Sequence, residues 1–438
     1  MTTTAPGPVG LAVLEMAQAG RFAEIRDMFA PQLRSMVTPG TLQAAWAAEL
    51  ARQGPVTGVG RPVTEPAGPG GSMVRIPVTF EHGELTVAVS VSDQGWLTGL
   101  QLLPASAAQP TRPWEPPPYT DPGAFGEQDV TVGSGPLAVP GTMSLPRQRG
   151  PLPAVVLLGG SGPVDRDETI GRNKPFKDLA WGLASRGVAV LRFDKVTHAH
   201  PEEVVKDHGF TLTNEYVPHA VAAIWALRQH PAVDAERVLV LGHSQGGTAA
   251  PRVAAAEPSV AGLVIMAGGT QPMHWAAVRQ VRYIASLDPA TAAASGPTIE
   301  AMTRQARLID SPGLSPATPA SELLFGVPAP YWLDLRGYDP AAAAAALGKP
   351  VLILQGGRDY QATVADDLPG WEAGLAGRPD VTVRVYPADN HLFFPGSGPS
   401  SPAEYEPAQH VDPAVVADVA SWLISGAIAP GEPSPPPG

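Results

Sequence analysis

A serine between two small residues carries the clearest chemistry in the sequence. Residues 242–246 read Gly-His-Ser-Gln-Gly, directly after the apolar run 237–241 and directly before a helical stretch. A serine on so tight a strand-to-helix turn has a strained backbone, and the glycines keep strand and helix from clashing. The N–H groups at the start of the following helix would face the reaction centre. The pattern predicts that Ser244 is a nucleophile for carbonyl carbon, rather than an idle serine in a glycine-rich turn.

A serine hydroxyl is a weak nucleophile at neutral pH, so it needs a base and an acid that orients the base. Asp359 follows the apolar run 351–355, and His391 follows the run 381–386. Both would lie at the carboxyl edge of a sheet, in the order acid then histidine that this kind of turn requires. We therefore predict Ser244, His391 and Asp359 as nucleophile, base and orienting acid.

Other residues compete for these roles. Asp366 and Asp367 fall inside the next helical pattern, and His410 precedes the last helix, where a solvated cap is the plainer interpretation. His243 neighbours the serine, but that position of the motif is expected to point away from the histidine base. These four residues remain the alternatives.

Acyl chemistry also needs donors for the oxyanion. We predict the backbone N–H groups of Gln245 and of Ser161, which lies in the loop Gly-Gly-Ser-Gly-Pro at 159–163. A nucleotide site is the rival interpretation of this loop, but the third glycine of a G-x-G-x-x-G pattern is replaced by Asp165, and no phosphate-loop Gly-Lys-Ser/Thr occurs.

Opposite charges gather at 165–167, Asp-Arg-Asp, and at 192–195, Arg-Phe-Asp-Lys. We interpret them as an ion-pair network that fixes the oxyanion loop, with binding of an anionic substrate group as the alternative. The sequence has no cysteine and no His-Glu-x-x-His or similar motif, so we predict no cofactor and no metal.

The elements that would position these residues alternate from about residue 127 onward. Continuously apolar strands between helices predict a mostly parallel sheet covered on both faces. The expected strands are 154–158, 188–193, 238–241, 262–266, 351–355 and 381–386, and the expected helices are 176–185, 216–228, a segment after Ser244, 364–376 and 413–424.

A strand-free, Ala- and Pro-rich segment at 271–348 interrupts this alternation. We predict a helical lid there. Its aromatic residues are candidates for an apolar substrate pocket, with ordinary core packing as the alternative for each: Trp275, Tyr283, Phe325, Tyr331 and Trp332.

The first 105 residues predict a separate small α+β domain, because helical spacing at 11–30 and 41–53 precedes alternating strands at 73–80, 85–91 and 96–103. A Pro-rich linker is expected at 106–125, the α/β domain at 126–428 and a disordered tail at 429–438.

The formal charge of −12 argues against nucleic acid or an anionic membrane as partner. Because no signal peptide or membrane span is evident, we expect a cytoplasmic protein that acts on a small molecule. The N-terminal domain is a candidate for homodimer formation or for covering the active site.

Several motifs together resemble bacterial α/β hydrolases of the dienelactone-hydrolase-like and prolyl-oligopeptidase-like esterase group. They are Gly-Ser-Gly-Pro at 160–163, the segments 165–169 and 173–180, Arg-Phe-Asp-Lys at 192–195 and Gly-His-Ser-Gln-Gly-Gly at 242–247. The resemblance covers about 127–425. It implies the α/β-hydrolase fold and ester hydrolysis through an acyl-enzyme, with Ser244, Asp359 and His391 in the family's triad positions.

Two further features bear on this resemblance. The family usually has His-Gly before the oxyanion serine, whereas this chain has Gly159-Gly160, which could loosen the loop or open the pocket. The N-terminal domain resembles an NTF2-like accessory domain, a domain of unknown function found ahead of such hydrolases.

The sequence therefore predicts a serine hydrolase of carboxylic esters, lactones or thioesters. The alternatives are a non-hydrolytic enzyme of the same fold in a natural-product pathway, performing acyl transfer, lactone formation or elimination, and a binding protein on an inactive hydrolase fold.

Overall fold

The computed structural model describes residues 6–30, 33–34, 37–66, 71–105, 114–148 and 150–425. The chain divides into two compact units, Met1–Pro113 and Trp114–Gly438, and each is described by itself. The predicted tail beyond 428 and the first half of the predicted linker lie outside the described residues. Within the described ranges, no helix has the length and apolar character needed to cross a bilayer.

The first unit consists of three helices followed by an antiparallel sheet. The helices are α1 Pro6–Gln18, α2 Phe22–Met28 and α3 Pro39–Gln53, and the strands are β1 Val56–Val59, β2 Val63–Pro66, β3 Gly71–Phe80, β4 Glu84–Ser92 and β5 Leu97–Pro104. The sheet order is β1-β3-β4-β5, with β2 also paired to β3. The helical spacing at 11–30 belongs to two helices, because Gly20 takes a φ of +72° between them.

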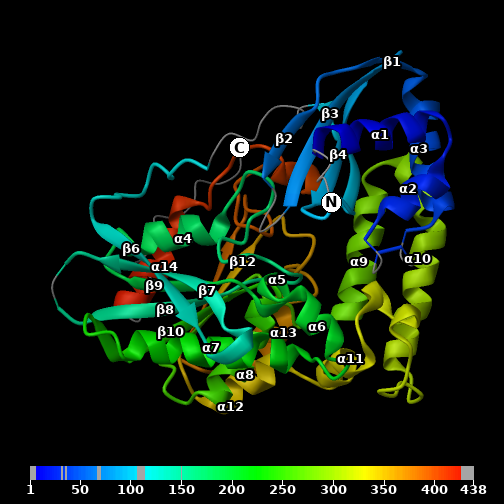
Figure 1. Ribbon diagram of the computed structural model, residues 1–438. Coiled ribbons are helices and arrows are strands. Elements are labelled where there is room, and N and C mark those ends of the chain that lie inside the picture. The colour runs from blue at the N-terminus through cyan, green and yellow to red at the C-terminus, as the bar shows by residue number, and fades with distance from the viewer. Residues whose placement is uncertain are drawn as a thin grey trace. The chain divides into compact units, whose positions relative to one another are not determined.

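The second unit is built on an eight-stranded sheet (Figure 1). Its strands are β6 Phe125–Val132, β7 Val139–Pro146, β8 Leu152–Leu158, β9 Ala189–Phe193, β10 Val233–His243, β11 Leu263–Met266, β12 Val351–Gly356 and β13 Val381–Tyr386. The order is β13-β12-β11-β10-β8-β9-β7-β6, parallel from β13 to β9 and antiparallel at β7 and β6. The predicted mostly parallel sheet is confirmed.

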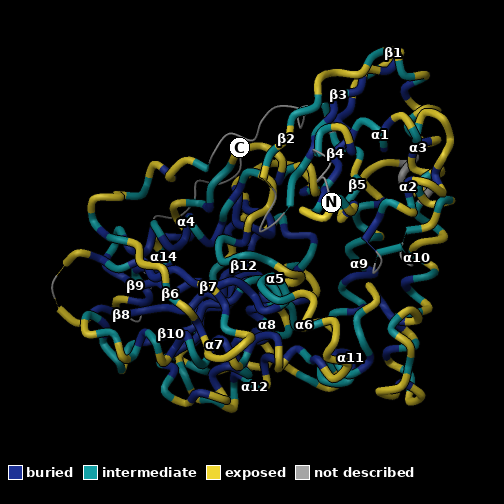
Figure 2. Tube along the Cα trace, viewed as in Figure 1, coloured by how far each residue is buried: buried dark blue, intermediate teal, exposed yellow. Residues whose placement is uncertain are grey.

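Helices cover both faces of this sheet, so its central strands are buried (Figure 2). Alternate residues such as Val156 and Val240 pack against α7 Leu212–Arg228 and α8 Gln245–Ala256. Their neighbours on the opposite face pack against α4 Pro175–Ala184 and α14 Pro413–Ser425. Burial on both faces explains why these strands are apolar without alternation.

The segment between β11 and β12 is helical, as expected at 271–348. It contains α9 Met273–Ser286, α10 Pro289–Asp310, α11 Ala329–Leu335 and α12 Pro340–Leu347. The two long helices α9 and α10 lie side by side (Figure 1). The insertion has an apolar cluster of its own, around Trp332 and Ile309.

Three further short α-helices belong to this unit: α5 Val196–Ala199, α6 Pro201–Lys206 and α13 Leu368–Gly374. The residues directly after the first unit pack onto α4, since Trp114 Nε1 donates to Asp178 Oδ1 at 2.8 Å. This second half of the predicted linker is therefore part of the second unit.

Candidate active site

Ser244 lies on a strained turn between β10 and α8. Its backbone has φ 53° and ψ −122°, a conformation that residues other than glycine rarely adopt. A Cβ at Gly242 would overlap the carbonyl oxygen of Gly246, and a Cβ at Gly246 would overlap that of Leu158. The glycines are therefore required by close backbone approach, as the motif predicts.

His391 and Asp359 meet at the carboxyl edge of the same sheet. His391 Nδ1 lies 2.7 Å from Asp359 Oδ2, and both residues are buried. The other carboxylate oxygen, Oδ1, accepts from the backbone N–H groups of Gln361 at 2.7 Å and Ala362 at 3.1 Å. Since a carboxylate only accepts, Nδ1 is the donor of this hydrogen bond, and Nε2 takes no part in it.

Ser244 and His391 both line one cavity. No hydrogen bond joins their side chains within the part of the chain that the structure describes. Such bonds are often long before substrate binds and tighten in the complex.

Two of the competing residues have other partners, although Asp367 also lines this cavity. Asp367 accepts from the backbone N–H groups of Thr270 and Gln271 and pairs with Arg279 at 2.6 Å, so it anchors the start of the helical insertion. His410 pairs with Asp178 at 3.1 Å. Neither residue contacts His391 in any interaction of the described chain.

The residues that carry the predicted oxyanion donors line the same cavity. Ser161 and Gln245 both line it, and no hydrogen bond among the described residues occupies either backbone N–H. The N–H of Gly160, by contrast, donates to Glu168 Oε1 at 2.6 Å. This bond fixes the loop while leaving the next N–H available.

The charged residues that follow the predicted oxyanion loop form ion pairs with β9 and with the residue after it. Arg166 pairs with Asp194 at 2.9 Å, and Arg192 pairs with Asp167 at 2.9 Å. Lys195 donates to the carbonyl oxygen of Gly160 at 2.8 Å.

Lys195 also begins a buried network that reaches the helical insertion. Its ammonium lies 2.8 Å from Glu215 Oε1, and Glu215 Oε2 accepts from the hydroxyl of Tyr331 at 2.6 Å. Tyr331 in turn accepts from Gln245 Nε2 at 3.1 Å, while Tyr216 donates to Gln245 Oε1. The sequence signalled none of these pairings, since their members lie far apart along the chain.

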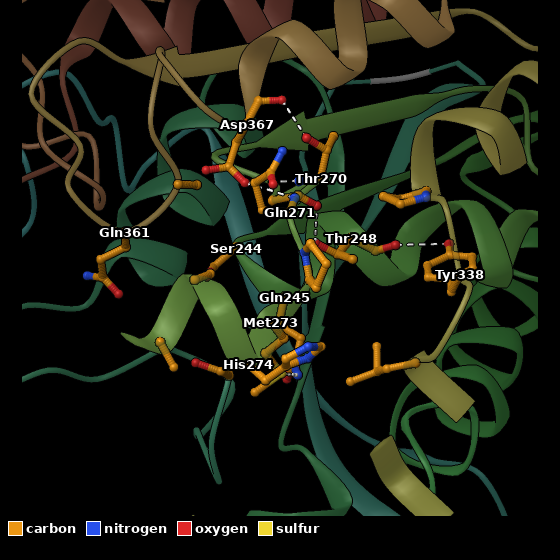
Figure 3. A pocket seen from close by; sticks show the side chains of 18 of the residues that line it. Ser244, Gln245, Thr248, Thr270, Gln271, Met273, His274, Tyr338, Gln361 and Asp367 are labelled. Atoms are coloured by element: carbon orange, nitrogen blue, oxygen red, sulfur yellow. Dashed lines mark hydrogen bonds between the residues drawn. The ribbon is translucent and has the colours of Figure 1, made fainter. Parts of the chain in front are cut away.

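The cavity has a volume of about 420 Å³. Figure 3 shows Ser244 on its wall, with Gln245, Gln271 and Gln361 around it. Its apolar lining includes Met273, Ala277, Ile309, Trp332 and Leu335. The lining therefore suits a ligand with both apolar and polar parts.

Of the five aromatic residues singled out in the insertion, Phe325 and Trp332 line this cavity. The others have different partners. Trp275 donates to Asp310, Tyr283 stacks on Tyr360 with ring centres 5.1 Å apart, and Tyr331 belongs to the network below Gln245.

One expectation was wrong. His243 does not point away from the base: its ring centre lies 4.7 Å from that of His391, and its Nε2 lies 2.9 Å from the His391 carbonyl oxygen. The motif alone could not reveal this contact, because it depends on where the loop after β13 returns to the sheet.

Comparison with known proteins agrees with this geometry. No protein-family profile matches the chain. The chain is, however, 37% identical over 346 residues to Esterase EstD of Thermotoga maritima, covering 79% of this chain and 78% of that protein. The chain belongs to the α/β-hydrolase family of EstD.

Solved structures similar to this hydrolase share less sequence. An esterase of Pyrococcus furiosus is 18% identical, with a TM-score of 0.41 and coverage of 65% of this chain and 91% of the other. A dienelactone hydrolase of Anabaena variabilis is 19% identical, with a TM-score of 0.39 and coverage of 70% and 100%. The 2,6-dihydroxy-pseudo-oxynicotine hydrolase is 20% identical, with a TM-score of 0.40 and coverage of 60% and 62%.

A second acid of the hydrolase lies two residues before His391. Asp389 is fully buried, and its side chain faces the carboxyl group of Asp412. Burial, followed by the charge of Asp412, raises the pKa of Asp389 from 3.8 to about 7. The folded hydrolase therefore holds this proton at pH values where the unfolded chain has lost it.

This shift predicts a pH-dependent effect of Asp389→Asn. As the pH rises from about 4 to about 7, Asp389 loses its proton in the unfolded chain but keeps it in the folded protein, so the free energy of unfolding of the wild type falls. Above about pH 7 the folded protein also ionises Asp389, and the wild type bears the full cost of the buried charge. The neutral amide avoids that cost. We expect the melting temperature of the variant, relative to wild type, to be several degrees higher at about pH 8.5 than at about pH 4.5. An equal difference at both pH values would contradict the assignment.

Proposed function

We propose that this α/β hydrolase is a serine esterase that cleaves carboxylic esters through an acyl-enzyme. Ser244 is the nucleophile, His391 the general base and Asp359 the orienting acid, with the backbone N–H groups of Ser161 and Gln245 as oxyanion donors. The identity to an esterase supports the reaction class.

The observation that carries the proposal is the grouping of three features around one cavity. A serine with a strained backbone and a histidine both line it, and the histidine is held through Nδ1 by a carboxylate whose other oxygen is fixed by two backbone N–H groups. A merely structural histidine would not need its second nitrogen directed at a cavity that contains a strained serine.

In the proposed reaction, His391 Nε2 takes the proton of Ser244 as its oxygen attacks the ester carbonyl carbon. The oxygen of that carbonyl becomes an oxyanion, which accepts hydrogen bonds from the N–H groups of Ser161 and Gln245. His391 then protonates the leaving alcohol. A water molecule, deprotonated by the same nitrogen, then attacks the acyl carbonyl carbon. As the bond from this carbon to the Ser244 oxygen breaks, His391 gives the proton to that oxygen, which releases the acid and restores the serine hydroxyl.

The test is covalent labelling of the purified protein with a fluorophosphonate, followed by peptide mapping. We expect one adduct per chain, on Ser244, because a phosphonylated serine occupies the same oxyanion donors as the tetrahedral intermediate. Labelling should disappear in Ser244→Ala. An adduct on another serine, or no adduct in the native protein, would refute the assignment.

A further inference from the structure

A second carboxylate–imidazole pair lies directly behind the proposed triad. His243 Nδ1 is 2.9 Å from Glu168 Oε1, and His243 Nε2 is 2.9 Å from the carbonyl oxygen of His391. Both side chains are almost fully buried, 5% exposed for His243 and 8% for Glu168. Neither residue has a role in the proposed reaction.

Both nitrogens of the His243 ring face acceptors, a carboxylate on one side and a carbonyl on the other. A neutral imidazole has a single N–H and would leave one acceptor facing a lone pair, whereas an imidazolium donates to both. Burial alone lowers the pKa of His243, but the charge and hydrogen bond of Glu168 and the His391 carbonyl outweigh it, so its pKa is raised. The geometry therefore fits an imidazolium at His243 that donates to Glu168 and to the His391 carbonyl oxygen.

Glu168 links this cation to the oxyanion loop. The same oxygen that accepts from His243 accepts from the N–H of Gly160, next to the proposed donor Ser161. Glu168 takes a φ of +52°, which a glutamate adopts only when its surroundings impose it. A Cβ at Gly160 would lie 3.0 Å from Glu168 Oε1 and 3.2 Å from Ser244 Cβ, so the glycine lets the carboxylate come this close.

We propose that Glu168 and His243 are positioning residues that hold the oxyanion loop and the loop of His391 at a fixed separation on either side of Ser244. The continuous path runs from the Gly160 N–H through Glu168 and His243 to the His391 carbonyl. This inference rests on the proposed function, because a fixed separation of the two loops matters for catalysis only if Ser161 and His391 act on one substrate.

The path explains how the loop stays ordered although Gly159-Gly160 stands where the family usually has His-Gly. The imidazole comes instead from the nucleophile turn, at His243, and reaches the loop through Glu168. Since the donors and the base must both meet the reacting carbonyl, a displacement of about 1 Å in either loop is expected to cost up to about 100-fold in rate.

Three variants and one control test the proposal. Glu168→Gln removes the charge, His243→Asn retains a donor near the position of Nδ1, and His243→Gln retains one near the position of Nε2. The matched control is His410→Gln, which removes the histidine of another carboxylate–histidine pair in the same unit, outside the cavity.

We expect each of the three variants to lower kcat by about 10- to 100-fold while KM changes by less than about threefold. Labelling of Ser244 should slow in parallel, and Glu168→Gln/His243→Gln should be no slower than the worse single variant, because both act through one path. The control should keep wild-type kcat. Folded variants that retain kcat within about threefold and lose only thermal stability would overturn the proposal.

Nuclear magnetic resonance of the wild-type protein gives a readout that needs no variant. The ring of His243 should keep both of its N–H protons to a higher pH than an ordinary histidine does, and these protons should exchange slowly. A His243 ring that becomes neutral at or below the pH at which an ordinary histidine does so would overturn the proposal. If wild-type Ser244 is not labelled at all, the proposed function fails instead, and the two failures are thus distinguishable.

Discussion

Ser244→Ala and His391→Ala are each expected to lower kcat for ester hydrolysis by about 10⁴- to 10⁶-fold, with KM within about tenfold of wild type. The alanine at 244 has no oxygen to acylate, and the alanine at 391 leaves nothing to take the serine proton. Because the two residues act as a unit, the double variant should be no slower than the slower single variant. Steady-state kinetics on p-nitrophenyl esters of graded chain length would measure this.

The matched control for the histidine is His410→Ala. His410 is the other histidine that follows Asp359 in the chain, and it is bound to Asp178 rather than to the proposed triad. We expect wild-type kcat for this variant. If His391→Ala kept its activity and His410→Ala lost it, the base would have been assigned to the wrong histidine.

The positions of Ser244, Asp359 and His391 were predictable because their signals are local. Each follows a strand of the parallel part of the sheet, and the carboxyl ends of parallel strands share one edge. Placing Ser244 after β10, Asp359 after β12 and His391 after β13 therefore required only the recognition of three strands. β10 and β12 are recognised by apolar runs that are buried on both faces, whereas the edge strand β13 is recognised by alternation of apolar and polar residues.

The antiparallel edge could not be recognised in the same way. β6 Phe125–Val132 is mostly polar and half exposed, and β7 Val139–Pro146 contains two prolines and a glycine. Such a strand has no continuous apolar run, and its pairing is settled by the neighbouring strand rather than by its own composition. The short strands β1 and β2 of the first unit were not predicted from the sequence for the same reason.

The contacts behind the site depend on loops that return from distant parts of the chain. Glu168 meets His243 across 75 residues, and Glu215 meets Tyr331 across 116. Charge clustering at 165–167 and 192–195 indicated that the oxyanion loop is held by ion pairs, but not that Glu168 would contact the nucleophile turn. Pairing across such separations is a property of the packed fold, not of local spacing.

Asp359→Asn is expected to lower kcat by about 10⁴-fold without loss of the fold. The reason lies in how the carboxylate is held. Asp359 Oδ1 accepts two backbone N–H groups, from Gln361 and Ala362, so the amide oxygen of an asparagine would occupy that position. The amide NH₂ would then face His391 Nδ1 as a donor. His391 could meet it only as an acceptor, which moves its proton to Nε2, where it blocks removal of the serine proton.

Asp367→Asn separates this effect from a general loss of buried charge. Asp367 is also buried and also accepts backbone N–H groups, but its charged partner is Arg279. We expect its asparagine variant to lower the melting temperature and to keep kcat within about tenfold of wild type at low temperature. Kinetics and thermal unfolding of both variants decide between the two acids. An Asp359→Asn variant that keeps wild-type kcat would contradict the assignment of Asp359, which holds His391 through Nδ1, as the orienting acid.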